Sequence, residues 1–150
     1  MRGLAAVAVA SLALVAGGCG GNDEANDYVS EVNAATGRFD DAVTTVASQA
    51  PSADSPSQAG KLLDAFAAEL DRSASRVKQI SPPEDVADLH ARLIKRIANL
   101  SDQVAAAADE LRGASAGRAA RELQAFVSKA TSEGQEVNNT IEQINRKLHD

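Results

Sequence analysis

The strongest constraint on the fold of this chain is a spacing that runs through its last quarter. Apolar or small residues recur there alternately four and three positions apart: Leu123, Val127, Ala130, Gly134, Val137, Ile141, Ile144 and Leu148. Because an α-helix has 3.6 residues per turn, this spacing places them on one stripe. A seven-residue repeat also favours left-handed packing at about 20°. We expect a helix from about Ser115 to Leu148, with Gly134 where a neighbouring helix approaches closely.

Three earlier segments have stripes of the same kind. Their apolar positions are Tyr28, Val32, Ala35, Phe39, Ala42 and Val46 in the first, Leu63, Phe66, Leu70, Val77 and Ile80 in the second, and Val86, Leu89, Leu93, Ile97, Leu100, Val104, Ala107 and Leu111 in the third. The stripes predict helices over about 23–49, 56–80 and 82–113. Much of the apolar content is Ala, the best helix former, and aromatic residues are few, which also disfavours strands.

Start and stop signals bound these helices. The segments Ser55-Pro56-Ser57-Gln58 and Ser81-Pro82-Pro83-Glu84 each fit a capping box with a proline in the first helical position. In such a box the serine accepts a hydrogen bond from the third helical amide, and the Gln or Glu side chain reaches back. Gly113 is expected to stop the third helix in a left-handed conformation.

The links between the predicted helices are short, and short links favour antiparallel neighbours. We therefore predict an all-α fold, an antiparallel up-down-up-down four-helix bundle. The fourth helix is the longest, so we expect part of it to extend past its neighbours.

The first 24 residues have a different pattern. Met1-Arg2 supplies a positive charge, an apolar run covers 3–16, the small residues Gly17-Gly18 precede Cys19, and the sequence then turns polar. This is the pattern of a bacterial export signal. The run is shorter than the roughly 20 apolar residues of a membrane-spanning helix. Two alternatives remain: an ordinary secretory signal cut after a triplet such as Ala8-Val9-Ala10, and a retained anchor.

The segment Ala16-Gly17-Gly18-Cys19 resembles the lipobox of bacterial lipoproteins. The resemblance implies cleavage between Gly18 and Cys19, and lipidation of the Cys19 sulfur with a diacylglycerol group. Two or more acyl chains of about 15 methylenes each would give on the order of 20 kcal/mol of membrane binding. The resemblance also implies a small helical extracytoplasmic domain, with a signal peptide at 1–18, a lipidated tether at 19–26 and the bundle at 27–150, on the outer face of the cell membrane.

The junction Ile80-Ser81-Pro82-Pro83-Glu84-Asp85-Val86, which leads to Leu89-His90, is similar to one in small helical lipoproteins of high-GC bacteria. The similarity implies the same helical fold and no particular activity.

The charge of the mature chain excludes some partners. Only Arg2 lies in the leader, so 14 basic and 21 acidic residues remain, and the net charge is about −7. Nucleic-acid binding rests on cations that neutralise phosphates, so this balance argues against nucleic acid. It argues equally against adhesion to anionic lipid headgroups. The membrane contact expected from the sequence is the lipid on Cys19.

No catalytic or metal-binding set can be assembled from the sequence. His90 has no Glu three residues before it and no second bundle histidine, so we expect no metal and no cofactor. We expect His90 at the edge of its stripe, with a ring nitrogen bonded to solvent or a carbonyl. The adjacent pairs Asp40-Asp41 and Asp109-Glu110 are expected on solvated helix faces. The sequence therefore predicts a protein that is not an enzyme.

Arg92, Lys95 and Arg96 form a basic cluster on one side of the third helix, and Asp88 is placed to pair with Arg92. The cluster is either a set of exposed helix salt bridges or a docking patch for an acidic partner. The first functional hypothesis is a membrane-anchored, non-enzymatic protein-interaction or cell-envelope module. The alternative is a small-molecule carrier or sensor with a cavity inside the bundle.

Overall fold

The computed structural model describes residues 23–149, and this part of the chain is all-α. It contains four long helices: α1 (Asp23–Gln49), α2 (Pro56–Gln79), α3 (Ala87–Gly113) and α4 (Ala116–His149). Two 3₁₀ turns, η1 (Ala50–Ser52) and η2 (Glu84–Val86), precede α2 and α3. Residues 23–26, which the sequence analysis assigned to the tether, belong to α1. Gly18 and Cys19 lie outside the described residues.

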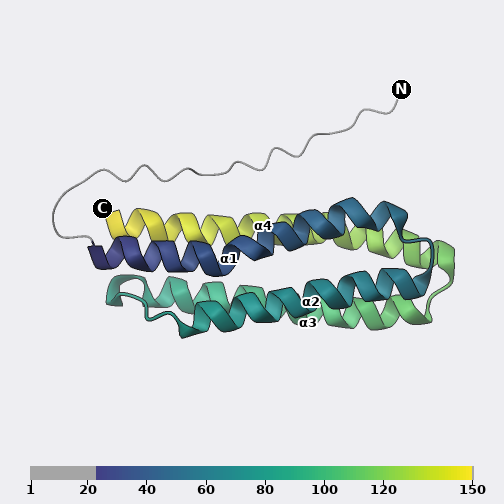
Figure 1. Ribbon diagram of the computed structural model, residues 1–150, viewed down its shortest axis with the longest axis horizontal. Helices are drawn as coiled ribbons and strands as arrows, with labels where there is room; N and C mark the ends of the chain where they lie inside the picture. The colour runs from purple at the N-terminus through teal and green to yellow at the C-terminus, as the bar shows by residue number, and fades with distance from the viewer. Residues whose placement is uncertain (1–22, 150) are drawn as a thin grey trace, which may run out of the picture.

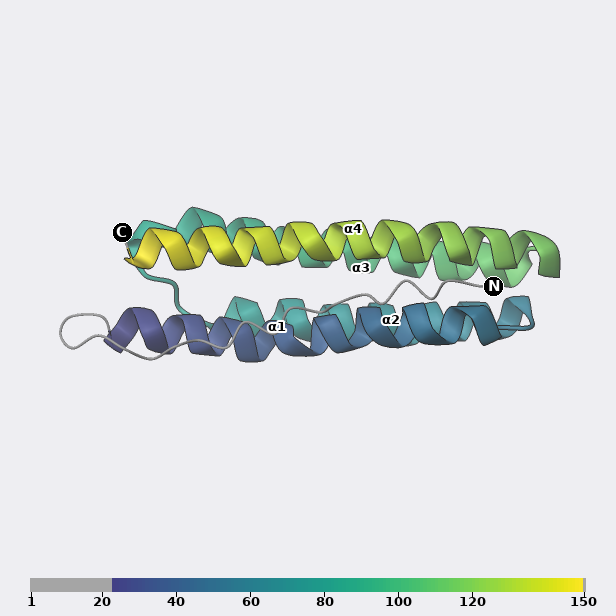
Figure 2. The ribbon, with the colours of Figure 1, turned by 90° about the horizontal axis from the view of Figure 1, so that it is seen from above.

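The four helices form an elongated bundle in which consecutive helices run in opposite directions (Figure 1). Each helix packs along the next one in the chain, and α4 closes the bundle against α1. Seen from above, α1 and α2 lie on one side and α3 and α4 on the other (Figure 2). Among residues 23–149, no helix is both long and apolar enough to cross a bilayer.

The predicted stripes form one hydrophobic core. Its largest fully buried side chains come from all four helices: Phe39, Phe66, Leu63, Leu70, Leu93, Ile97, Leu100, Leu111, Leu123, Ile144, Val32 and Val77. The α4 stripe differs from the prediction at two positions, because Val127 and Leu148 are only partly buried. Phe126 is buried, with 8% of its surface exposed, whereas Val127 is only partly buried. A straight helix drifts relative to a strict seven-residue repeat, and the larger aromatic side chain takes the inward position.

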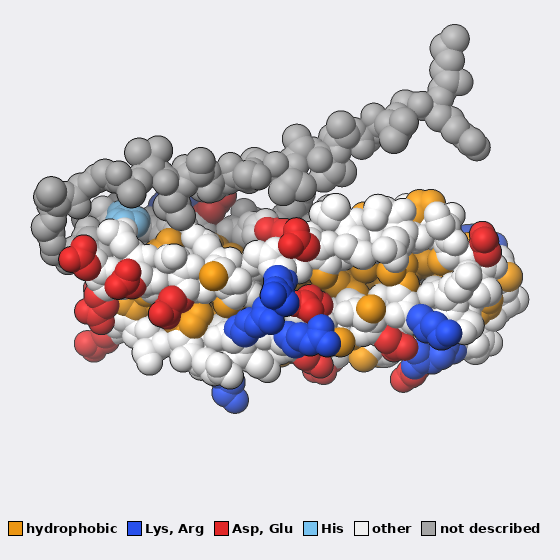
Figure 3. Space-filling view, viewed as in Figure 1, with side chains coloured by type: hydrophobic (Ala, Val, Ile, Leu, Met, Phe, Trp, Pro, Cys, Tyr) orange, Lys and Arg blue, Asp and Glu red, His pale blue; other side chains and the backbone are white. Residues whose placement is uncertain are grey.

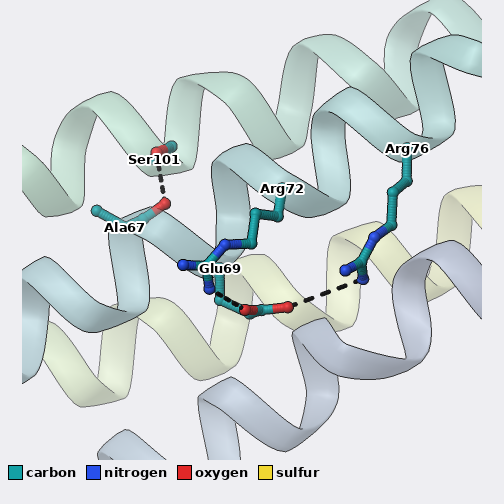
Figure 4. A network of polar contacts seen from close by, with 5 residues as sticks. All are labelled: Ala67, Glu69, Arg72, Arg76 and Ser101. Carbon is teal, nitrogen blue, oxygen red and sulfur yellow. Dashed lines mark hydrogen bonds and ion pairs between the residues drawn. The ribbon is translucent and has the colours of Figure 1, made fainter.

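The α2–α3 pair is the most extensive helix contact. Small residues allow it: a Cβ added to Gly60 on α2 would lie 3.2 Å from the Ala108 carbonyl oxygen on α3. Seven residues further along α2, the Ser101 hydroxyl of α3 donates a hydrogen bond of 3.1 Å to the Ala67 carbonyl oxygen (Figure 4). Because this hydroxyl bonds to the backbone of the facing helix, it fixes the register of the pair.

Gly134 on α4 meets α1 closely, as its place in the stripe predicted. A Cβ there would lie 3.3 Å from Cε1 of Phe39. The neighbour that approaches Gly134 is therefore the aromatic ring of α1, which occupies the space that a larger α4 side chain would take.

The capping predictions are half right. Ser55 accepts a hydrogen bond of 3.2 Å from the Gln58 amide, as expected, but the Gln58 side chain accepts from the Asp54 amide and not from Ser55. The second capping box does not form, and α3 begins only at Ala87, after η2. The residue before a proline is disfavoured in the α region, so Pro83 keeps Pro82 out of a helix.

Two predictions at the ends of the later helices are wrong. Gly113 is still helical, and the chain leaves α3 through Ala114 in an extended conformation, with φ −85° and ψ 160°. The fourth helix also does not extend far past its neighbours. Ala119 and Ile144, with 2% and 0% of their surfaces exposed, are both buried, so only about a turn at each end of α4 lies outside the core. α4 also contacts the two 3₁₀ turns, η1 and η2.

Candidate functional site

A surface groove between α1 and α2 is the best-formed concave feature of the bundle. It has a volume of about 490 Å³ and is lined by Arg38, Asp41, Ala42, Thr45, Val46, Gln49, Leu62, Ala65, Phe66 and Glu69. Several of these side chains are exposed, so the groove is open to solvent. Figure 3 shows it as a hollow with hydrophobic side chains along its length. The alternative hypothesis placed a cavity inside the bundle, whereas this groove lies on its surface.

The floor of the groove is the outer edge of the core. Phe66 and Val46 are buried, whereas Ala42 and Leu62 are partly buried and face the opening. The small side chains of Ala42 and Ala65 leave the space between α1 and α2 unfilled. The floor can therefore accept an apolar group without any rearrangement of the helices.

One end of the groove carries a charged cluster around Glu69 of α2 (Figure 4). Arg72 donates a hydrogen bond of 2.7 Å to Oε2 of Glu69, and Nη1 of Arg76 lies 3.9 Å from Oε1. The second distance is too long for a hydrogen bond, and Oε1 is buried without a hydrogen-bond partner in this structure. Two guanidinium groups therefore converge on a carboxylate that is only 17% exposed.

Arg38 of α1 lines the same groove and makes no ion pair with any residue of the described range. Of the charged residues that line the groove, Arg38 is positive and Asp41 and Glu69 are negative, and Arg72 and Arg76 partly offset Glu69 from outside the lining. In Figure 3, Lys and Arg side chains gather in the middle of this face, beside the hollow.

The basic cluster expected on α3 is present but only partly paired. Arg92 and Lys95 are exposed, and neither makes an ion pair with a residue in 23–149. The predicted Asp88–Arg92 pair does not form. Arg96 instead reaches across to α4, where its Nη2 lies 3.5 Å from Oε2 of Glu136. The helix that carries the cluster, α3, lies with α4 on the side of the bundle opposite α1 and α2 (Figure 2).

His90 is not the boundary residue that the sequence predicted. Only 5% of its surface is exposed, and its Nδ1 lies 2.9 Å from the hydroxyl of Tyr28, which is also buried. The hydrogen bond joins α1 to α3 across 62 residues of sequence. Burial lowers the pKa of His90 and raises the pKa of Tyr28 to about 12, so both groups are neutral near neutral pH. The hydrogen bond between neutral His90 and Tyr28 thus links two helices.

The adjacent carboxylates are not all on solvated faces as expected. Asp40 is half-buried, and its burial is the main cause that raises its pKa. The side chain of Asn138 on α4 acts in the opposite direction and lowers the pKa of Asp40. Asp109 is exposed and pairs with Arg112, three residues further along α3. Asp40 is thus partly withdrawn from solvent, and Asp109 belongs to a surface ion pair.

Among residues 23–149, no group of three or more His, Cys, Asp or Glu side chains lies close enough together to hold a metal ion.

No known protein family, curated protein or solved structure matches the chain. The candidate sites are therefore assigned from the geometry alone. The sequence analysis found the basic cluster but missed the α1–α2 groove. A signal was present, because Leu62 and Glu69 are seven residues apart and so share one face of α2.

Proposed function

We propose that this chain is a lipid-anchored module on the outer face of the cell membrane, which binds a partner and does not catalyse a reaction. The lipobox at Cys19 supports the anchor. The observation that carries the interaction role is the pair of exposed cations Arg92 and Lys95, which make no ion pair with any residue in 23–149. On an acidic chain, these cations offer a positive surface to an acidic protein or envelope polymer.

The basic cluster would act mainly on recognition and association rate. A single exposed ion pair contributes only about 0.2–1 kcal/mol. Complementary charges nevertheless steer encounter and disfavour wrong partners. Arg96 is fixed at one edge of the cluster by its ion pair with Glu136. Arg92 and Lys95, which make no ion pair within 23–149, supply the charges that a partner can meet.

The anchor is tested by Cys19→Ser in intact cells. We expect the wild-type chain in the membrane fraction with the mass of a diacylated protein, and the variant unprocessed and without the lipid mass. An unchanged mass and unchanged membrane retention would exclude the lipidated tether.

The interaction is tested by photo-crosslinking from position 92 in cells, with position 61 on α2 as the matched exposed control. We expect a discrete crosslinked species from position 92 only, which is lost in Lys95→Glu and in high salt. The α2 variant Lys78→Glu is the charge-matched control and should leave the species in place. Equal crosslinking from both positions would contradict docking at the basic cluster.

A second candidate function is favoured by a different observation. The α1–α2 groove has the volume of small-molecule sites, which run from about 300 to 1,000 Å³, and it combines an apolar floor with a few charged groups. On this view the module carries or senses a small ligand.

A further inference from the structure

We infer that the basic cluster of α3 docks a second copy of this chain, which contributes the acidic first half of its α1. The inference rests on the proposed function, because it takes the docking cluster and the membrane anchor from there and names the partner. Three properties of the described residues support it: the charges of the two helix faces, the directions in which these faces point, and their levels along the bundle.

The first half of α1 carries negative charge alone. Over residues 23–37 its charged residues are Asp23, Glu24, Asp27 and Glu31, all of them exposed, and none makes an ion pair with a residue in 23–149. Figure 3 shows Asp and Glu side chains at the end of the bundle where α1 begins. Asp23 and Glu24 lie in the first turn, where negative charge stabilises a helix start. Asp27 and Glu31 lie beyond that turn and repel each other at a spacing of four residues, so nothing in α1 itself stabilises their charges.

The basic cluster is the counterpart of this acidic face. Over residues 90–101, α3 has three Lys and Arg side chains and no acidic one, and Arg92 and Lys95 make no ion pair with a residue in 23–149. Two carboxylates border the cluster: Asp88 lies one turn before Arg92, and Glu136 of α4 pairs with the third cation. The cations still outnumber these carboxylates, and like charges three and four residues apart on a helix repel. Contact between the two faces would relieve the repulsion on both helices.

The two charged faces point away from each other in one molecule. Glu31 lies seven residues before Arg38, which lines the α1–α2 groove, so both lie on the same side of α1. The basic cluster lies toward α4, because Arg96 reaches Glu136 of that helix. Since α1 and α2 lie on one side of the bundle and α3 and α4 on the other (Figure 2), the clusters cannot pair within one chain. The α3 face of one copy can instead meet the α1 face of the next.

The two faces also lie at the same level along the bundle. The hydrogen bond between Tyr28 and His90 joins α1 to α3, and these two helices run in the same direction (Figure 1). Glu31 lies three residues after Tyr28, and Arg92 lies two residues after His90. At a rise of 1.5 Å per residue, their levels therefore differ by only about 2 Å. Copies anchored as proposed above all have the start of α1 nearest the membrane, so neighbours present the two faces at matching heights.

The membrane anchor makes a contact of this kind sufficient. A single exposed ion pair contributes little to stability in solution. Chains held on one membrane, however, meet at a raised effective concentration, as linked binding modules do. Because each copy uses a different face toward each neighbour, every contact leaves one face of each kind free, and the association forms rows and not closed pairs.

The test is crosslinking of the full-length chain in intact cells from two introduced cysteines. Ala34 and Asn99 are exposed and uncharged, and they lie three residues after Glu31 and four residues after Lys95, on the same helix faces. A chain with both Ala34→Cys and Asn99→Cys should give a ladder of dimers, trimers and longer products with a thiol crosslinker of about 10 Å, the distance between packed helices. Each single variant should give no more product than the wild-type chain, which has one cysteine of its own. Lys61→Cys with Asn99→Cys, which moves the first thiol to the other end of the bundle, is the matched control and should give no ladder.

Charge reversal in the double-cysteine chain identifies the contact. Glu31→Lys or Arg92→Glu alone should reduce the ladder several-fold, and the two together should recover it at least in part, because opposite charges meet again. Lys78→Glu is the charge-matched control and should leave the ladder unchanged. A double-cysteine chain without a ladder, or a double reversal no better than the single ones, would overturn the inference.

The photo-crosslink from position 92 separates this inference from the proposed function. A product that joins two copies of this chain, with the second copy attached within 23–38, supports both. A product that contains only another protein or an envelope polymer leaves the proposed function in place and refutes the self-contact. If position 92 gives no product of any kind, both are refuted.

Discussion

Replacement of Gly60 by alanine tests whether α2 and α3 are in contact as closely as the structure shows. The new Cβ would lie 2.7 Å from Cγ of Arg112 and 3.2 Å from the Ala108 carbonyl oxygen. The first distance is shorter than any normal contact, so Arg112 must move. This movement would strain its ion pair with Asp64, where Nη1 and Oδ2 are 2.6 Å apart. The second distance involves backbone, so relief there requires the helices to separate.

The magnitude follows from two opposing effects. Glycine to alanine in a helix interior gains about 1 kcal/mol in intrinsic propensity. Overpacking of a well-filled interface costs about 1–3 kcal/mol. Gly60→Ala should therefore leave stability unchanged or lower it by about 2 kcal/mol. At Gly37 on α1 a Cβ would meet nothing within 4 Å, so Gly37→Ala should raise stability by about 0.5–1 kcal/mol.

The assay is denaturant unfolding of both variants, followed by the helical circular dichroism signal. The difference between them measures the steric cost, because the propensity gain is common to both. Gly134→Ala should fall between the two, since its Cβ would lie 3.3 Å from Cε1 of Phe39. If Gly60→Ala stabilised the protein as much as Gly37→Ala, the close α2–α3 approach would be wrong.

Three further predictions concern the polar groups that link the helices. Tyr28→Phe should lower the free energy of unfolding by about 1–3 kcal/mol, because buried Nδ1 of His90 loses its partner; an unchanged unfolding midpoint would contradict the bond. Stability should fall as the pH drops below 6.5, the ordinary pKa of histidine, because the lowered pKa of folded His90 means that the unfolded chain binds a proton first. The slope of unfolding free energy against pH should flatten in His90→Asn, and an unaltered slope would assign it to another group. Asn138→Ala should raise the pKa of Asp40 further, because the Asn138 side chain opposes the effect of burial; an NMR titration of the carboxyl carbon that shows no change would contradict this influence.

The helices themselves could be predicted from the sequence, because their stripes depend on residues three and four positions apart. Local chemistry also predicted the Ser55 cap. It failed at Ser81, where Pro83 immediately follows Pro82 and restricts the backbone more strongly than the capping pattern favours a helix. The position of Phe126 instead of Val127 in the core reflects a choice between neighbouring side chains that only the packing against other helices decides.

The sites were harder to predict because they combine residues that are far apart in the chain. The hydrogen bond between Tyr28 and His90 spans 62 residues, and neither residue type indicates the other. The groove likewise depends on the register of α1 against α2, because this register brings Arg38 of α1 and Glu69 of α2 into the lining of the same groove. A pattern within one helix identifies a face, but it does not identify what lies opposite.

The position of the groove along α1 has a consequence for the way a ligand is selected. Arg38 lies 15 residues after Asp23, where α1 begins, and this separation corresponds to about 22 Å along the helix axis. If the bundle is tethered with the Asp23 end of α1 at the membrane, the distance from the membrane surface to Arg38 exceeds two Debye lengths. Each Debye length is about 8 Å at physiological ionic strength. The electric field of the lipid headgroups is then almost fully screened at Arg38. Ligand preference would be set by the protein's own charges and would stay the same in membranes of different lipid composition.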